Sequence, residues 1–218
     1  LGVAGDSSRL PDQRPATDTL AMLADVEAGR ELESRSFRTA RHLQSLYVVG
    51  AGLGVAVALG NMLTGSGEDP AVDWSSVPVV IAFVATLVPF FHGAMMYMDA
   101  AFSGPPASVL VDFIALFSQT LLFFVMAGFI REPTSFVWSL TALLIVDIAW
   151  IVWLRRKGIK DYTPWAVINT VCVAVLVLLI ALHHWPQGPN LMLAGAIAVI
   201  ALARSAADYV LGRNVYSD

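Results

Sequence analysis

Residues 190–211 read NLMLAGAIAVIALARSAADYVL and place Arg204 and Asp208 four residues apart in an otherwise apolar run. A helix of about 20 apolar residues is long enough to cross the roughly 30 Å hydrocarbon core of a bilayer. Charged side chains inside such a helix are costly unless other polar groups face them. The segment therefore predicts a membrane span whose charged pair meets polar side chains from neighbouring spans.

Five further apolar runs of similar length precede this segment, at residues 43–63, 77–99, 107–130, 134–154 and 164–184. The chain has 218 residues, of which 57% are hydrophobic and 14% are charged. Its mean hydropathy is +0.69. Soluble domains lie nearer roughly 45–50% apolar and about 25% charged residues. We predict an all-α polytopic membrane protein, a six-transmembrane-helix bundle over residues 43–211 in contact with the lipid bilayer.

The segments outside the predicted spans are polar. Residues 1–16 lack the apolar core of a signal peptide and predict a disordered tail. Residues 17–42 suit a helix whose arginines crowd the end next to the first span. This helix either lies on the membrane surface or packs against a partner or a second copy. Its thin apolar stripe favours a cytoplasmic helix that continues into the first span. Residues 212–218 are predicted as a cytoplasmic tail.

The basic residues predict the orientation of the spans. With the N-terminus inside, nine Lys and Arg residues from residue 17 onward fall on the cytoplasmic side and only Arg131 falls outside. The nine are Arg30, Arg35, Arg38, Arg41, Arg155, Arg156, Lys157, Lys160 and Arg213. Because cytoplasmic loops carry an excess of basic residues, this distribution places both termini in the cytoplasm of an inner (plasma) membrane protein.

Polar side chains recur within the predicted spans, and they are candidates for a transport site or a polar network. They are His92, Asp99, Asp112, Asp147, Asn169, Arg204, Asp208 and Tyr209. With a rise of about 1.5 Å per residue, most of them lie in the inner half of the membrane, whereas Gln119 falls in the outer half. Since the acids outnumber Arg204, we expect a polar cavity that opens toward the cytoplasm.

Pro89 lies inside the second span and predicts a kink, because proline cannot donate a hydrogen bond to the carbonyl of Ala85. His92 follows within one turn. It either satisfies the freed carbonyl or takes part in chemistry.

Small residues in the first span predict close helix packing. Gly50 and Gly54 form a GxxxG pair, and Gly52, Ala56 and Gly60 make a second row of small residues four apart. Such rows let two helix backbones approach closely. The partner is either another helix of the same chain or a second copy in a homo-oligomer.

Three functions from different classes remain. The acid surplus favours a proton, cation or small-solute channel or transporter. The alternative is a non-catalytic membrane subunit or scaffold that binds a cytoplasmic protein through residues 17–42 or 155–163. The second alternative is an intramembrane enzyme that acts on a lipid or small molecule, although the sequence holds no paired-histidine metal motif and no nucleophile elbow.

The composition gives further expectations about ligands. We assign no catalytic residue and expect no cofactor, and the sequence does not decide on a metal. The single cysteine, Cys172, is expected to be a small buried hydrophobe. A net charge of −4 and a pI near 5.5 argue against nucleic-acid binding, which requires a basic face.

Overall fold

The computed structural model of the chain describes residues 26–27, 41–64, 71–101, 106–157, 162–182 and 190–213. The predicted tail 1–16 lies outside these residues, as do most of the predicted helix 17–42 and residues 214–218. Residues 158–161 of the basic loop 155–163 are also outside the description.

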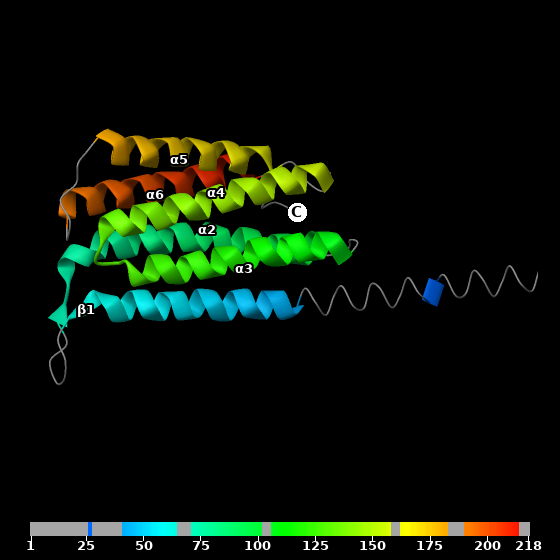
Figure 1. Cartoon of the computed structure of the whole chain (residues 1–218), viewed down its shortest axis with the longest axis horizontal. Helices are drawn as coiled ribbons and strands as arrows, with labels where there is room; N and C mark the ends of the chain where they lie inside the picture. The colour runs from blue at the N-terminus through cyan, green and yellow to red at the C-terminus, as the bar shows by residue number, and fades with distance from the viewer. Residues whose placement is uncertain are drawn as a thin grey trace, which may run out of the picture.

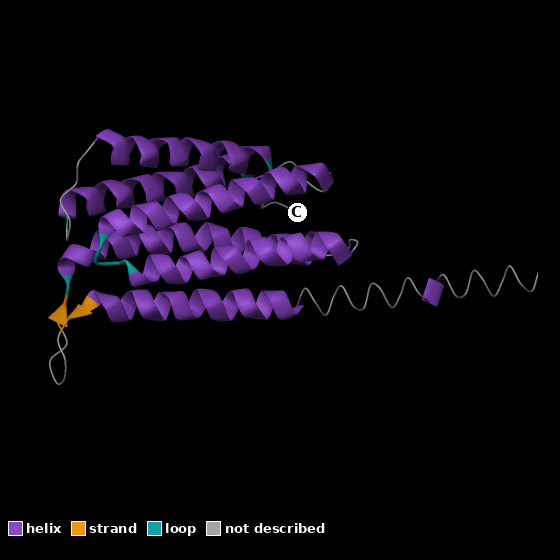
Figure 2. Ribbon diagram, viewed as in Figure 1, coloured by secondary structure: helices purple, strands orange, loops and turns teal. Residues whose placement is uncertain are grey.

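Within the described ranges, six helices are long and apolar enough to cross a membrane. They are Arg41–Met62, α2 (Val77–Ala101), α3 (Pro106–Gly128), α4 (Pro133–Lys157), α5 (Thr163–Leu182) and α6 (Leu191–Leu211). Their bounds lie within a few residues of the apolar runs in the sequence. The helices lie side by side along one common direction (Figure 1), and the described fold is almost entirely helical (Figure 2).

Local sequence signals set several of the helix ends. Pro133 is the first residue of α4. The N–H that proline lacks would have no hydrogen-bond partner within the helix at this position. The side chain of Asn190 caps α6 by accepting a hydrogen bond from the backbone N–H of Leu193 at 3.0 Å. The helices therefore begin where the sequence supplies a residue that tolerates the unpaired first turn.

A short hairpin joins the Arg41–Met62 helix to α2, which the sequence did not predict. Strand β1 (Leu63–Thr64) pairs antiparallel with β2 (Ala71–Val72). The 3-10 helix η1 (Trp74–Ser76) follows, with Asp73 as its N-cap. We call this side of the bundle the hairpin end, and the opposite side, where Arg41 and Leu211 lie, the Arg41 end (Figure 1).

Asp73 ties the hairpin end together. The hydroxyls of Ser75 and Ser76 donate hydrogen bonds to its carboxylate at 2.5 and 2.7 Å, and they hold the pKa of Asp73 below its usual range. Arg131, in the turn between α3 and α4, lies 3.9 Å from this carboxylate and donates to the carbonyl of Leu63 at 2.6 Å. The hairpin and the turn between α3 and α4 are thereby joined.

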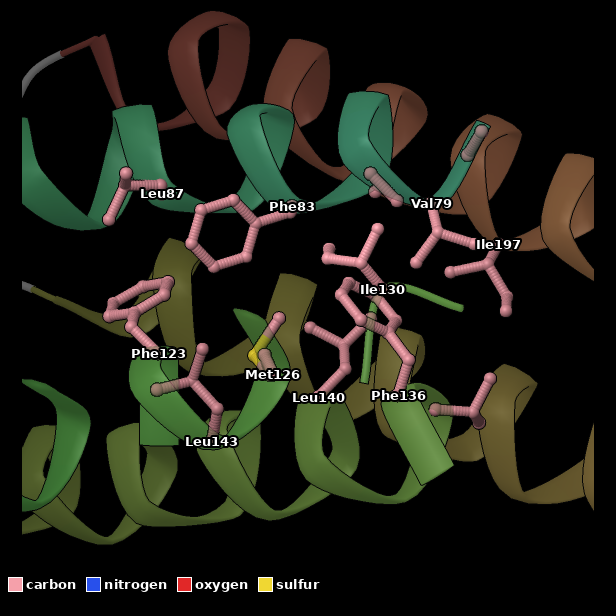
Figure 3. Close-up of a cluster of buried hydrophobic side chains, with 14 of the residues drawn as sticks. Val79, Phe83, Leu87, Phe123, Met126, Ile130, Phe136, Leu140, Leu143 and Ile197 are labelled. Carbon is pink, nitrogen blue, oxygen red and sulfur yellow. The ribbon is translucent and has the colours of Figure 1, made fainter. Parts of the chain in front are cut away.

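The half of the bundle next to the hairpin end is a continuous apolar core. Helix α2 packs most extensively on α6, and α4 packs on both α3 and α5. Figure 3 shows side chains from α2, α3, α4 and α6 meeting in this core. Its labelled members are Val79, Phe83, Leu87, Phe123, Met126, Ile130, Phe136, Leu140, Leu143 and Ile197. The buried charged side chains lie in the other half of the bundle.

The three glycines of the first helix that were predicted to pack, Gly50, Gly54 and Gly60, have different surroundings. A Cβ on Gly50 would collide with the methyl group of Thr120 in α3, and one on Gly54 would lie 3.5 Å from the ring of Phe83 in α2. This pair therefore packs within the chain. No described atom lies within 4 Å of a Cβ built on Gly60, so Gly60 does not pack against another described helix of this chain, and its packing against a second copy stays a prediction.

Gly50→Ala should lower the free energy of unfolding by about 1–3 kcal/mol, because the added methyl group overpacks the contact with Thr120. The Thr120 hydroxyl donates to the carbonyl of Leu116 at 2.9 Å, so its methyl group cannot turn aside without breaking that hydrogen bond. Unfolding of the purified protein in mixed micelles under increasing denaturing detergent measures the change.

Gly52→Ala is the matched control, since no described atom lies within 4 Å of its added Cβ. It should leave stability unchanged or raise it by up to about 1 kcal/mol through helix propensity. Equal stability of the two variants would contradict the assigned packing face.

Candidate functional site

Asp147 of α4 lies at the centre of a buried hydrogen-bonded network. Its carboxylate accepts a hydrogen bond from the side-chain amide of Gln119 in α3 at 2.9 Å. Its second oxygen accepts from the amide of Asn169 in α5 at 2.5 Å. Both donors are neutral, so they satisfy the carboxylate oxygens without cancelling a negative charge.

Arg204 of α6 reaches Asp147 only through Asn169. The Nε of Arg204 donates to the Asn169 side-chain oxygen at 2.9 Å, while its Nη2 lies 3.8 Å from the carboxylate of Asp208. The guanidinium carbon sits 4.7 Å from the ring centroid of Phe90 in α2, in cation–π range. The sequence predicted that the charged pair meets polar side chains from neighbouring spans, and Arg204 does so at Asn169, whose amide stands between Arg204 and Asp147.

The network extends to the first helix, where the Tyr47 hydroxyl donates to the Gln119 side-chain oxygen at 3.5 Å. We define the central network as Tyr47, Gln119, Asp147, Asn169, Arg204 and Asp208. All six side chains are buried, and they come from five of the six membrane-length helices. A chain of hydrogen bonds and one ion pair therefore crosses the bundle at one level.

A small cavity lies beside the network, between α2 and the charged side chains. Its volume is about 20 Å³, and Gln119, Asp147, Arg204 and Asp208 contribute the polar part of its lining. A water molecule needs about 10–15 Å³ measured in this way. Among the described residues, a polar cavity is thus present at the size of a single water molecule, and its opening toward the cytoplasm stays a prediction.

Asp112 occupies a separate site nearer the Arg41 end. The Tyr97 hydroxyl of α2 donates to one carboxylate oxygen at 2.7 Å, and the Trp150 indole N–H of α4 donates to the other at 3.1 Å. The rings of Tyr97 and Trp150 pack edge to face, with centroids 4.9 Å apart. This arrangement links three helices around one carboxylate, since Asp112 belongs to α3.

His92 and Tyr209 pair with each other at the surface of the bundle. Their Nδ1 and hydroxyl oxygen are 3.4 Å apart, and Tyr209 is 38% exposed. Both line a groove of about 550 Å³ beside the first helix. Asp99 lies in α2, but its side chain falls outside the described residues.

The backbone carbonyl that Pro89 leaves without a helical donor in α2 accepts a hydrogen bond from a residue that the sequence did not predict. The hydroxyl of Ser205 in α6 donates to the carbonyl of Ala85, the group that Pro89 leaves without a helical donor. The structure thus assigns to Ser205 the role that the sequence suggested for His92. Hydroxyl groups of neighbouring helices commonly satisfy such carbonyls in membrane helices.

Five hydrogen-bonding residues of these sites were not predicted: Tyr47, Tyr97, Gln119, Trp150 and Ser205. Gln119 had a usable signal, because it lies seven residues after Asp112 and thus near the same helix face. The position of Gln119 along its predicted span placed it in the outer half of the membrane, whereas its side chain bonds Asp147 near the middle of the bundle. Among the described residues, no group of three His, Cys, Asp or Glu side chains could hold a metal ion.

Comparisons with protein-family models, with curated proteins and with solved structures returned no match to this chain. The interpretation of the site therefore depends on its own geometry.

Ser205→Ala should lower the free energy of unfolding by about 1 kcal/mol, because the carbonyl of Ala85 loses its donor. In a Pro89→Ala background the same substitution should cost almost nothing, since the restored N–H at position 89 can bond Ala85. A double-mutant cycle in mixed micelles measures this coupling. An equal cost of Ser205→Ala in both backgrounds would contradict the assignment.

Proposed function

We propose that this chain is a multi-pass membrane protein that translocates protons, with Asp147 as the proton-binding group. The supporting observation is the imbalance of buried charge. Among the described residues, the buried acidic and basic side chains are Asp112, Asp147, Asp208 and Arg204, three acids against one base. Ionisable groups inside a membrane are expensive, and they are kept where they carry ions or protons.

The geometry around Asp147 supports this role over a simple ion pair. Arg204 lies against Asp208, whereas neutral amides from Gln119 and Asn169 hold Asp147. A proton is the cation that can neutralise Asp147 within such a closely packed site. The oxygens of Asp147 also border the water-sized cavity, through which a proton can arrive.

The remainder of the bundle supports a carrier that changes conformation more than an open pore. The hairpin half is a tight apolar core. The Arg41 end, which the basic residues place in the cytoplasm, is the nearer side for entry. Ser205 bonds the carbonyl of Ala85, which Pro89 leaves free, where α2 packs on α6, and a proline site with a hydrogen bond from another helix is a suitable point for the two helices to move.

A second candidate is a non-catalytic membrane subunit in which the central network is structural. It is favoured by the hydrogen bonds that join Gln119, Asp147, Asn169 and Arg204 into one connected set. Binding of a cytoplasmic protein through residues 17–42 or 155–163, or of a second copy, belongs to this candidate.

Asp147→Asn should reduce proton flux into liposomes by about tenfold or more, because an amide cannot take up and release the proton. The purified protein is reconstituted with a pH-sensitive dye inside the vesicles, and a potassium diffusion potential drives proton entry. Asp73→Asn, the same chemical change at the hairpin end, should leave the flux near that of the wild type.

Detergent unfolding of the same preparations separates the two candidates. Loss of flux in a folded Asp147→Asn protein supports translocation. A wild-type flux no greater than that of protein-free liposomes would overturn it, as would an unchanged flux in Asp147→Asn. Destabilisation by Asp147→Asn without any effect on flux would favour the structural subunit.

A further inference from the structure

We infer that the cavity beside Arg204 binds one ordered water molecule, which connects Asp208 with Asp147. The cavity measures about 20 Å³, and both carboxylates and Arg204 contribute to its lining. A buried water requires roughly this volume and two to four polar partners. This inference extends the proposed function: a role of the water in transport rests on the proposal that the protein translocates protons.

An independent observation points to an occupant. Arg204 is only 7% exposed, and its Nη1 has no hydrogen-bond partner among the described residues. The other two guanidinium nitrogens are engaged, Nε with Asn169 and Nη2 with Asp208. A charged donor buried in this way is costly unless something accepts its hydrogen bond. The guanidinium therefore needs an acceptor, and of the two hollows that Arg204 lines in the described part of the chain, the small cavity is the one with further polar side chains, Gln119, Asp147 and Asp208.

The surrounding chemistry selects water over other small occupants. The occupant must accept a hydrogen bond from Arg204 and donate to the carboxylates of Asp147 or Asp208. A metal or ammonium cation cannot accept from Arg204, and a bound anion would add to the surplus negative charge. Water both accepts and donates, and its size matches the cavity.

The water would complete a proton path between two acids. A proton that enters at Asp208 passes to the water as the water gives one of its own protons to the Asp147 carboxylate. One O–H bond forms and one breaks at the water, and no other reactant is needed. The charged and titratable groups that line the cavity are Asp147, Asp208 and Arg204, while Tyr47 faces the network through Gln119.

The cavity can be narrowed without touching a polar group. Ala94 of α2 lines it and is 3% exposed, so Ala94→Val places two methyl groups at the water site. Ala82→Val is the matched control, because Ala82 lies fully buried in the same helix but within the apolar core. Both variants add the same volume to a buried position, and only one of them removes the space for water.

The test combines a structure with flux. High-resolution electron cryomicroscopy of the wild-type protein in lipid nanodiscs should show density within hydrogen-bonding distance of Arg204 Nη1, and Ala94→Val should remove it. In liposomes, Ala94→Val should lower proton flux by about tenfold, whereas Ala82→Val should stay near the wild type.

Two results would overturn the inference. The first is a wild-type map of sufficient resolution for ordered water that shows no density in the cavity. The second is an Ala94→Val protein that loses the density but keeps the wild-type flux. Asp147→Asn still reports on translocation in either case, so failure of the water path is distinguishable from failure of the proposed function.

Discussion

The hydrogen bonds of Asn169 are the constraint on which the central network depends. Its amide nitrogen donates to Asp147 and its amide oxygen accepts from Arg204, so one neutral side chain satisfies an anion and a cation together. Neither a carboxylate nor a guanidinium could do both. Because a bilayer core offers no water to buried polar groups, this bridge allows opposite charges to sit on α4 and α6 without direct contact.

The apolar core and the buried polar contacts occupy mainly different halves of the bundle. The core fills the half next to the hairpin end, where α2, α3, α4 and α6 meet. In the other half, Asp112 joins α3 to α2 and α4. Ser205 joins α6 to α2 at Ala85, between the core residues Phe83 and Leu87. Asp112, Asp147 and Arg204 thus each have partners on other helices, whereas Asp208 pairs with Arg204 on its own helix. The same bonds that keep the acids in the membrane also hold the helices in register.

The sequence predicted the helices well and their faces only in part. Apolar run length is a local property, so the bounds of the helices follow the hydropathy closely. Gly50 and Gly60 looked alike in spacing, yet only Gly50 meets another helix. His92 was nearest to the carbonyl of Ala85 along the chain, but Ser205, 120 residues away, reaches it. Proximity along one helix does not show which neighbour packs against it.

By itself, the sequence determined six membrane-length apolar helices and the list of charges that they carry, because hydropathy and residue identity belong to each segment alone. Only the tertiary structure decided that Gln119 and Asn169 hold Asp147, that Arg204 turns toward Asp208, and that the polar cavity has room for a single water molecule. A hydrogen bond requires two groups within about 3 Å, and that distance depends on how each helix is rotated against its neighbours.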